Sequence, residues 1–288
     1  MTEDLDLFSE VNFIKLRNSS EFLNYDYNIL TKGFWVYYVL GKKRFISDID
    51  VLTFNSNLLC KMLKRRGFKI YKLRHEILAK KDVNIDIKTN LGFNSFIFKI
   101  PKMELLKDSF LLKGKRFLSV EDHIIVTCLH CSYHHGFANL DKAIFDLKLT
   151  LQTNINWKKV IKKSKTYRCS EFVFFMLNFF KNSSDDLNNV LHELNKMSRS
   201  KVLRKIKRVY ANSKTNFRIH PHVMDFKTHF YYENLIGKIF VLVDKLFSPV
   251  DLIALEFGID PNKKIKYLLC FPLYPVRIFK IIMRIFYG

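Results

Sequence analysis

The chain has 288 residues, of which 48% are hydrophobic, so it is long enough for two domains and too apolar for a disordered polymer. Its formal net charge of +22 favours polyanionic partners such as nucleic acid, nucleotides or anionic lipid head groups. Five cysteines without a framework spacing argue against a disulfide scaffold. The acidic N-terminus and the lack of a run of about 18 apolar residues lead us to expect a cytoplasmic protein without a transmembrane segment.

The first 115 residues alternate short strands with helices. Strands are predicted at 27–30, 45–52, 68–73, 76–79 and 84–88. A helix over 34–40 should stop at Gly41, and Asn55, Ser56 and Asn57 offer N-caps for a second helix that ends near Gly67. We therefore expect an α+β fold, with a small mixed-sheet domain over residues 1–115.

The rest of the chain is predicted to be almost wholly helical. Ser119 and Asp122 have the spacing of a capping box at the start of a helix. Helices are expected over 119–134, 139–153, 157–164, 170–181 and 185–210, with a polar connector at 211–217. Prolines after residue 249 should keep the last helices short. We expect an α-helical domain at 116–210 and a basic helical C-terminal extension at 211–288.

Three aspartates are the strongest candidates for chemistry. Asp48 and Asp50 stand at i and i+2 of an alternating strand, which places both carboxylates on one face of a sheet. Asp86, between Ile85 and Ile87 of a later strand, can supply a third carboxylate. Such a set suits two magnesium ions, which neutralise the charge on a transferring phosphate. A solvated acidic strand face is the alternative.

A turn upstream of these aspartates has the features of a phosphate-binding segment. Lys32-Gly33 ends one strand and opens a helix, so the backbone can approach a phosphate near a helix N-terminus. Lys32 and Arg44 would add charge-assisted hydrogen bonds to a triphosphate.

These segments resemble the nucleotidyltransferase superfamily, which has a polymerase-β-like fold. The closest resemblance is to the uncharacterised nucleotidyltransferase family, whose members show Leu-Lys-Gly and then Arg-x-x-Ser-Asp-Ile-Asp. This chain has Thr31-Lys32-Gly33, and then Arg44 to Asp50 with Ser47 in the serine position. The family's later Asp-Leu-His strand corresponds to Asp86-Ile87-Lys88, where Lys88 replaces the histidine.

The resemblance implies a magnesium-dependent transfer of a nucleoside monophosphate from an NTP to an acceptor, with release of pyrophosphate. Asp48 and Asp50 would bind both metal ions, and Asp86 would complete one metal site and help to activate the acceptor. The nucleotide-binding residues would be Lys32, Gly33, Arg44 and Ser47. The acceptor is open between a small molecule, a peptide or protein, and RNA. Alternatives are a toxin-like enzyme that acts on tRNA and a non-catalytic module that binds nucleotides or polyanions.

The resemblance continues into the helical part, to about residue 165. Leu129-His130 to His134 is similar to the family's Leu-His-x-x-x-His helix, and Ala143 to Leu147 is similar to its Asp-Leu helix. It therefore singles out His130 and His134, which either face the substrate cleft or make a structural hydrogen bond to Asp146.

The same segment invites a zinc-site interpretation. Cys128, His130, Cys131, His134 and His135 lie within eight residues. Structural zinc sites usually pair two separated knuckles, which this segment lacks. Packing of Cys128 and Cys131 in the core is therefore the favoured interpretation.

Two runs of basic residues lie at 158–168 and 201–208. We interpret them as solvated helix faces, with an RNA-binding surface as the alternative. The tail mixes basic and large apolar residues. We expect it to dock on the helical domain, with peripheral membrane contact as the less favoured alternative.

Overall fold

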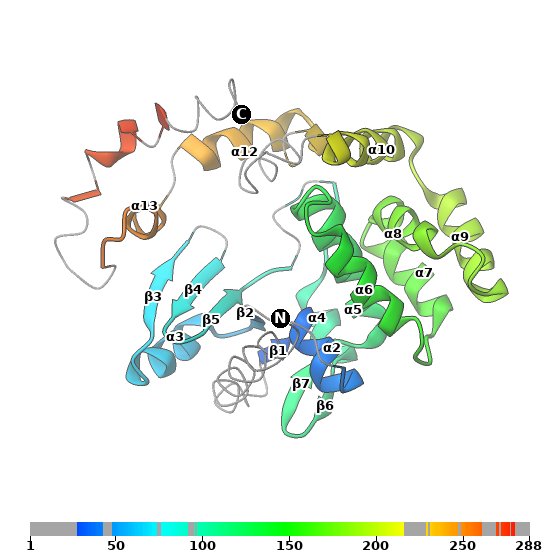
Figure 1. Cartoon of the computed structure of the whole chain (residues 1–288), viewed down its shortest axis with the longest axis horizontal. Helices are drawn as coiled ribbons and strands as arrows, with labels where there is room; N and C mark the ends of the chain where they lie inside the picture. The colour runs from blue at the N-terminus through cyan, green and yellow to red at the C-terminus, as the bar shows by residue number, and fades with distance from the viewer. Residues whose placement is uncertain are drawn as a thin grey trace, which may run out of the picture. The chain divides into compact units, whose positions relative to one another are not determined.

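The computed structural model describes residues 28–42, 48–73, 76–91, 95, 97–215, 229, 231–246, 249–260, 269–270, 272–276 and 278–279. The chain divides into two compact units (Figure 1). The first comprises residues 1–91, 102–119 and 248–279, and the second comprises 92–101, 120–247 and 280–288. Among the described residues, no helix combines the length and the apolar character needed to span a membrane.

One mixed sheet organises the described part of the first unit. Its strands are β1 (Asn28–Leu30), β2 (Asp48–Thr53), β3 (Lys69–Lys72), β4 (Glu76–Lys80), β5 (Asn84–Lys88), β6 (Phe110–Leu112) and β7 (Lys115–Phe117). The order across the sheet is β3-β4-β5-β2-β1-β7-β6. The β2–β5 and β1–β7 pairs are parallel, and the other pairs are antiparallel. The mixed sheet and the helices that follow confirm the predicted α+β class.

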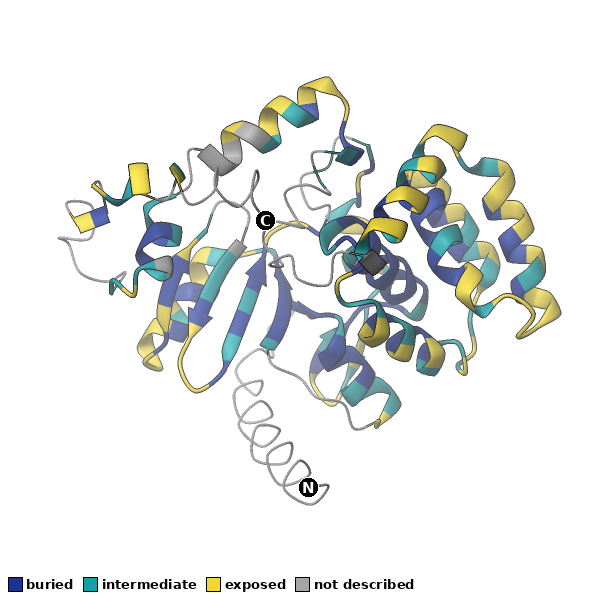
Figure 2. Cartoon of the chain, turned by 45° about the horizontal axis from the view of Figure 1, so that its top comes forward, coloured by how far each residue is buried: buried dark blue, intermediate teal, exposed yellow. Residues whose placement is uncertain are grey.

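The apolar residues of the central strands β2 and β5 are buried in the core. Ile49 and Val51 of β2 and Ile85 and Ile87 of β5 are completely buried. Figure 2 shows the middle of the sheet coloured mainly as buried. The alternating polar residues of the same strands consequently lie on the other face of the sheet.

The helices of this unit whose bounds the structure describes include α2 (Gly33–Leu40), α3 (Ser56–Arg65), α4 (Lys102–Asp108) and α13 (Val250–Glu256). The predicted ends of two helices are confirmed. Gly41 ends α2 in the left-handed conformation, with φ of 62°. The Asn55 side chain accepts a hydrogen bond from the Leu58 N–H at the start of α3.

The β6–β7 hairpin was not predicted from the sequence. Lys113 and Gly114, which join its strands, have φ of 49° and 73°. Positive φ at both central residues matches the twist that favours a two-residue hairpin loop. The glycine was the available signal.

A segment near the C-terminus belongs to the sheet unit. The Asp251 carboxylate of α13 accepts a hydrogen bond of 2.7 Å from the Lys72 N–H of β3. Ile253, Ala254 and Cys270 form a buried cluster beside it. A contact between positions this far apart in sequence cannot be read from local periodicity.

The described part of the second unit is helical. Its α-helices are α5 (Val120–Leu129), α6 (Leu140–Thr150), α7 (Trp157–Thr166), α8 (Ser170–Leu177), α9 (Asp185–Met197), α10 (Ser200–Thr215) and α12 (Leu235–Leu246). A π-helical turn, His130–His134, extends α5, and a 3₁₀ turn, Asn178–Phe180, extends α8.

Two predictions in this unit were wrong. The single helix expected over 185–210 is two helices, because Ser198 ends α9 in an extended conformation with ψ of 133°. The connector expected at 211–217 is helical as far as Thr215. Polar composition alone therefore did not distinguish an exposed helix end from a loop.

Candidate active site

The sheet brings three carboxylates together. Asp48 and Asp50 lie on β2 and Asp86 lies on β5. In the parallel pairing of these strands, Asp50 is the register partner of Asp86. Ligand oxygens of all three side chains lie within 4.8 Å of one another. The predicted convergence of the three aspartates is therefore present, and their catalytic role stays a prediction.

The local sequence explains this arrangement. Side chains at i and i+2 of a strand share a face, so Asp48 and Asp50 point the same way while Ile49 points into the core. Register pairing then places Asp86 beside Asp50 on the adjacent strand. Asp50 is the most enclosed of the three, with 6% of its surface exposed.

Lys32 contacts the central carboxylate directly. It lies in the turn between β1 and α2, and its Nζ is 2.5 Å from Asp50 Oδ1. The Thr31 N–H donates to the Asp50 backbone oxygen at 3.1 Å, which fixes the turn against β2. The Lys32 backbone has φ of 55° and ψ of −130°, a conformation that is strained for a side chain with a Cβ.

Burial lowers the pKa of Lys32 below its ordinary value of 10.5. The negative charge of Asp50 opposes this effect, and the positive charge of Lys88 adds to it. A buried lysine with a shifted pKa beside a carboxylate cluster is a common feature of functional sites.

Lys88 is a second cation at the same carboxylate. Its Nζ is 3.6 Å from Asp50 Oδ1, and only 5% of the residue is exposed. Lys88 departs from the family motif, and its position beside Asp50 was not predicted from the sequence. The signal was its spacing of two from Asp86, because this spacing puts both side chains on one face of β5.

Of the other predicted nucleotide-binding residues, the structure describes only Gly33. Gly33 is buried and begins α2. The first N–H groups of a helix have no partner within the helix, so this end suits an anion. Arg44 and Ser47 lie outside the described residues.

The donor set of the aspartate cluster fits magnesium. Magnesium takes oxygen ligands at about 2.1 Å in octahedral geometry, so two oxygens on one ion lie at most about 4.2 Å apart. The carboxylate oxygens lie within 4.8 Å of one another, so side-chain rotation can bring them onto a common ion. The three carboxylates also exceed the charge of the two nearby lysines, so the cluster retains negative charge for a divalent ion.

The histidines of the second unit form a separate group. Ring nitrogens of His130, His134 and His135 lie within 4.8 Å of one another. Asp146, on α6, is 4% exposed and is not a member of this group. The expected cleft role of His130 and His134 and the alternative bond to Asp146 both stay predictions.

The cysteines beside these histidines are core residues. All five cysteines are free and buried. Burial raises the pKa of Cys131 to about 12 and that of Cys128 well above its ordinary value. Among the described residues, the side-chain groups spaced to hold a metal ion include no cysteine, which argues against a cysteine-ligated zinc site.

Comparison with known proteins gives one match. The family model described as "Uncharacterised nucleotidyltransferase" matches residues 29–183, more than half of the chain. No curated protein and no solved structure matches the chain. The matched region spans the strands that carry the three aspartates and the turn that carries the three histidines.

Proposed function

The chain belongs to the uncharacterised nucleotidyltransferase family, and from this premise we propose that it transfers a nucleoside monophosphate from an NTP to an acceptor in a magnesium-dependent reaction. The observation that carries the proposal is the convergence of Asp48, Asp50 and Asp86 on the paired strands β2 and β5. In the reaction, an acceptor oxygen bonds to the α-phosphorus. The bond from that phosphorus to the bridging oxygen breaks, and pyrophosphate leaves with the electron pair.

The three aspartates would hold the magnesium ions. When bound, magnesium neutralises the negative charge on the α-phosphate and on the pyrophosphate. Asp48 and Asp50 share one strand face and would serve both ions. Asp86, less buried than Asp50, would complete one site and help to accept the proton of the acceptor hydroxyl.

The turn before α2 would hold the triphosphate. Lys32 already approaches Asp50 from this turn, so its ammonium lies where donor phosphates would meet the carboxylates. Gly33 adds the N-terminal end of α2. We propose that Arg44 and Ser47 also contact the nucleotide.

Labelled donors test the proposal. The full chain is incubated with each α-³²P NTP, magnesium and one acceptor pool at a time: total RNA, protein extract or small metabolites. Transfer of label into any pool, abolished in an Asp48→Asn, Asp50→Asn double variant, is the expected result. Asp82→Asn, at an exposed position in the turn before β5, is the control and should retain transfer.

The acceptor pool that takes the label distinguishes the alternatives. Labelled tRNA would identify the toxin-like enzyme, and a labelled peptide or metabolite would identify a different acceptor class. NTP binding without labelling of any pool would contradict transfer and favour the non-catalytic module. Transfer that persists in the double variant would remove the aspartates from the mechanism.

A further inference from the structure

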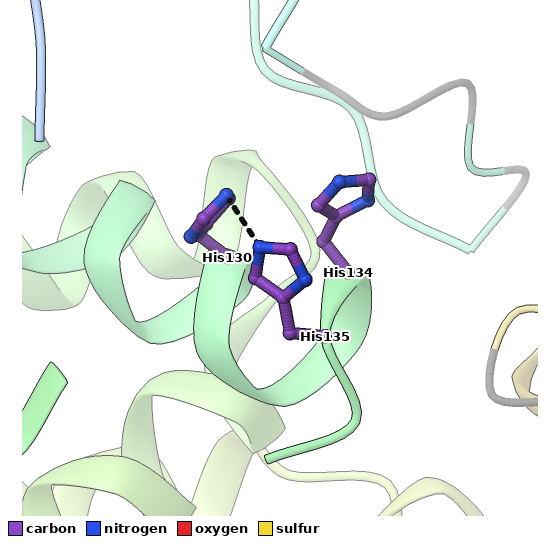
Figure 3. A group of neighbouring side chains, drawn as sticks. All are labelled: His130, His134 and His135. Atoms are coloured by element: carbon purple, nitrogen blue, oxygen red, sulfur yellow. Dashed lines mark hydrogen bonds between the residues drawn. The ribbon is translucent and has the colours of Figure 1, made fainter. Parts of the chain in front are cut away.

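Three histidines converge on one turn of the second unit. His130 and His134 lie in the π-helical turn that follows α5, and His135 is the next residue. Figure 3 shows the three rings gathered on one side of this turn. All three residues are partly exposed, so the cluster is accessible to a small ion from solvent. The aspartates proposed for nucleotidyl transfer are not part of it.

The π-helical turn is what brings the third histidine into the cluster. The His135 N–H donates to the His130 oxygen at 3.1 Å, a bond that spans five residues. In an α-helix of 3.6 residues per turn, positions five apart diverge by about 140° around the axis. The wider π-helical turn instead places both His134 and His135 close to His130. Single π-helical turns inside α-helices occur frequently at functional sites.

The ring nitrogens have the separations of ligands around one ion. His130 Nε2 and His135 Nε2 are 3.1 Å apart. Two imidazole nitrogens on a tetrahedral zinc, each at about 2.05 Å, are about 3.3 Å apart. The third ring also contributes a nitrogen to the group within 4.8 Å. The His134 ring centroid lies 4.6 Å from that of His135 and 5.3 Å from that of His130, so side-chain rotation can bring the third ring onto a common ion.

We propose that His130, His134 and His135 form a binding site for a divalent transition-metal ion of the zinc class. Imidazole ligands favour zinc, cobalt, nickel or copper over magnesium, which prefers oxygen. The site is thus chemically distinct from the aspartate cluster. Three protein ligands leave a coordination position for water or for an anionic ligand. The proposal does not depend on nucleotidyl transfer.

The alternative is a purely structural histidine pair. In the metal-free protein, one Nε2 of the 3.1 Å contact donates a proton and the other accepts it. A metal ion would take the place of that proton, which moves to Nδ1 of the same ring, and because a protonated imidazole cannot bind a metal, binding should weaken at acidic pH.

Cobalt(II) titration of the full-length protein tests the proposal. Tetrahedral nitrogen-ligated cobalt absorbs visible light far more strongly than cobalt with octahedral oxygen ligands. We expect one strongly absorbing ion per chain, displaced by zinc. We expect zinc binding to weaken by more than about 100-fold in each of the variants His130→Gln, His134→Gln and His135→Gln. This loss is larger than the usual effect of changing a residue that only hydrogen-bonds to a metal ligand.

Two controls isolate the site. His192→Gln changes an exposed histidine of α9 and should leave the absorption unchanged. The Asp48→Asn, Asp50→Asn variant should also retain it. Loss of the band in the aspartate variant, or its persistence in all three histidine variants, would overturn the proposal.

A measurement on the wild-type chain tests the metal site even if the histidine variants do not fold. X-ray absorption of the zinc-loaded protein should show nitrogen ligands at 2.0–2.1 Å. A first shell made only of oxygen, or the absence of stoichiometric zinc binding by calorimetry, would equally overturn the site.

Discussion

The ammonium of Lys32 lies 2.5 Å from the carboxylate of Asp50, the most enclosed aspartate of the cluster. Lys88 adds a second ammonium 3.6 Å from the same oxygen. The central carboxylate of the candidate active site is therefore paired with two cations from the chain itself. These lysines set the charge that a divalent ion meets on binding.

Removing the charge of Lys88 should tighten binding of a divalent ion at the aspartates. Lys88→Met keeps a long, buried side chain but removes a positive charge beside Asp50. Repulsion between an ammonium and a divalent ion a few ångströms away costs about 2 kcal/mol even in water. We expect the dissociation constant for Mn²⁺, measured by electron paramagnetic resonance, to fall about tenfold.

The control for that change is Lys80→Met, an exposed lysine on β4 of the same sheet. It should leave Mn²⁺ binding nearly unchanged. Weaker Mn²⁺ binding in Lys88→Met would mean that the lysine supports the ion rather than opposing it.

Lys32 should make stability depend on alkaline pH. Burial lowers its folded-state pKa, whereas the unfolded chain keeps the proton up to about pH 10.5. Between the two pKa values the unfolded state binds more protons, so the Lys32 contribution to stability rises with pH. The unfolding free energy of the wild type relative to Lys32→Met should therefore increase as pH approaches 10.5.

Urea unfolding at a series of pH values measures this difference. The exposed Lys42→Met variant controls for the loss of a lysine at the other end of α2. A difference between wild type and Lys32→Met that stays flat or falls with pH would contradict the assignment.

Lys163 should stabilise the second unit although it belongs to a basic run. Its Nζ lies 2.5 Å from Asp122 Oδ2, and Asp122 is fully buried. Lys163→Met leaves that buried carboxylate without its ammonium, and such losses cost about 3–5 kcal/mol. Lys162→Met, at an exposed position one residue earlier, should change the unfolding free energy little.

A double variant separates the effect of the Lys163–Asp122 ion pair on stability from the effect of side-chain packing. Asp122→Leu combined with Lys163→Met removes both charges and should recover part of the lost stability. Equal unfolding free energies for Lys163→Met and Lys162→Met would show that the pair contributes nothing.

A side chain at Gly237 should destabilise the second unit. A Cβ at this position of α12 would lie 2.4 Å from Glu233 Oε2 and 2.8 Å from its Cβ. Glu233 cannot move freely, because its Oε1 accepts hydrogen bonds from Tyr133 at 2.6 Å and from Ser95 at 2.8 Å. We expect Gly237→Ala to cost about 1–3 kcal/mol in thermal unfolding.

The neighbouring Ile236, 68% exposed, offers the control. Ile236→Ala should change stability far less than Gly237→Ala. A Gly237→Ala melting temperature equal to that of the wild type would show that the Glu233 network adapts without cost.

Local pattern determined much of the sheet unit. Alternation placed Asp48 and Asp50 on one strand face, and the limits of β5 match the prediction at both ends. Gly41 and Asn55 indicated helix ends correctly. A left-handed residue and a capping side chain interact only with the adjacent turn of the helix, so their effect is visible in the local sequence.

Partners that are distant in sequence were decided only by the tertiary structure. The lateral order of strands places β5 beside β2, and this makes Asp86 the register partner of Asp50. In the second unit, the packing of α7 against α5 buries Lys163 against Asp122, whereas its basic neighbours suggested a solvated face. Strand order and burial depend on contacts across the whole unit, which the period of a single segment does not contain.

The sequence by itself therefore determined that three aspartates occur on strands, with Asp48 and Asp50 on a common face, and that His130 and His134 share a helical segment. Only the tertiary structure decided that Asp86 pairs in register with Asp50, that Lys32 and Lys88 face Asp50, and that a π-helical turn adds His135 to the histidines. The reason is physical: side-chain direction follows the local backbone, whereas proximity follows strand pairing and the exact winding of each helix.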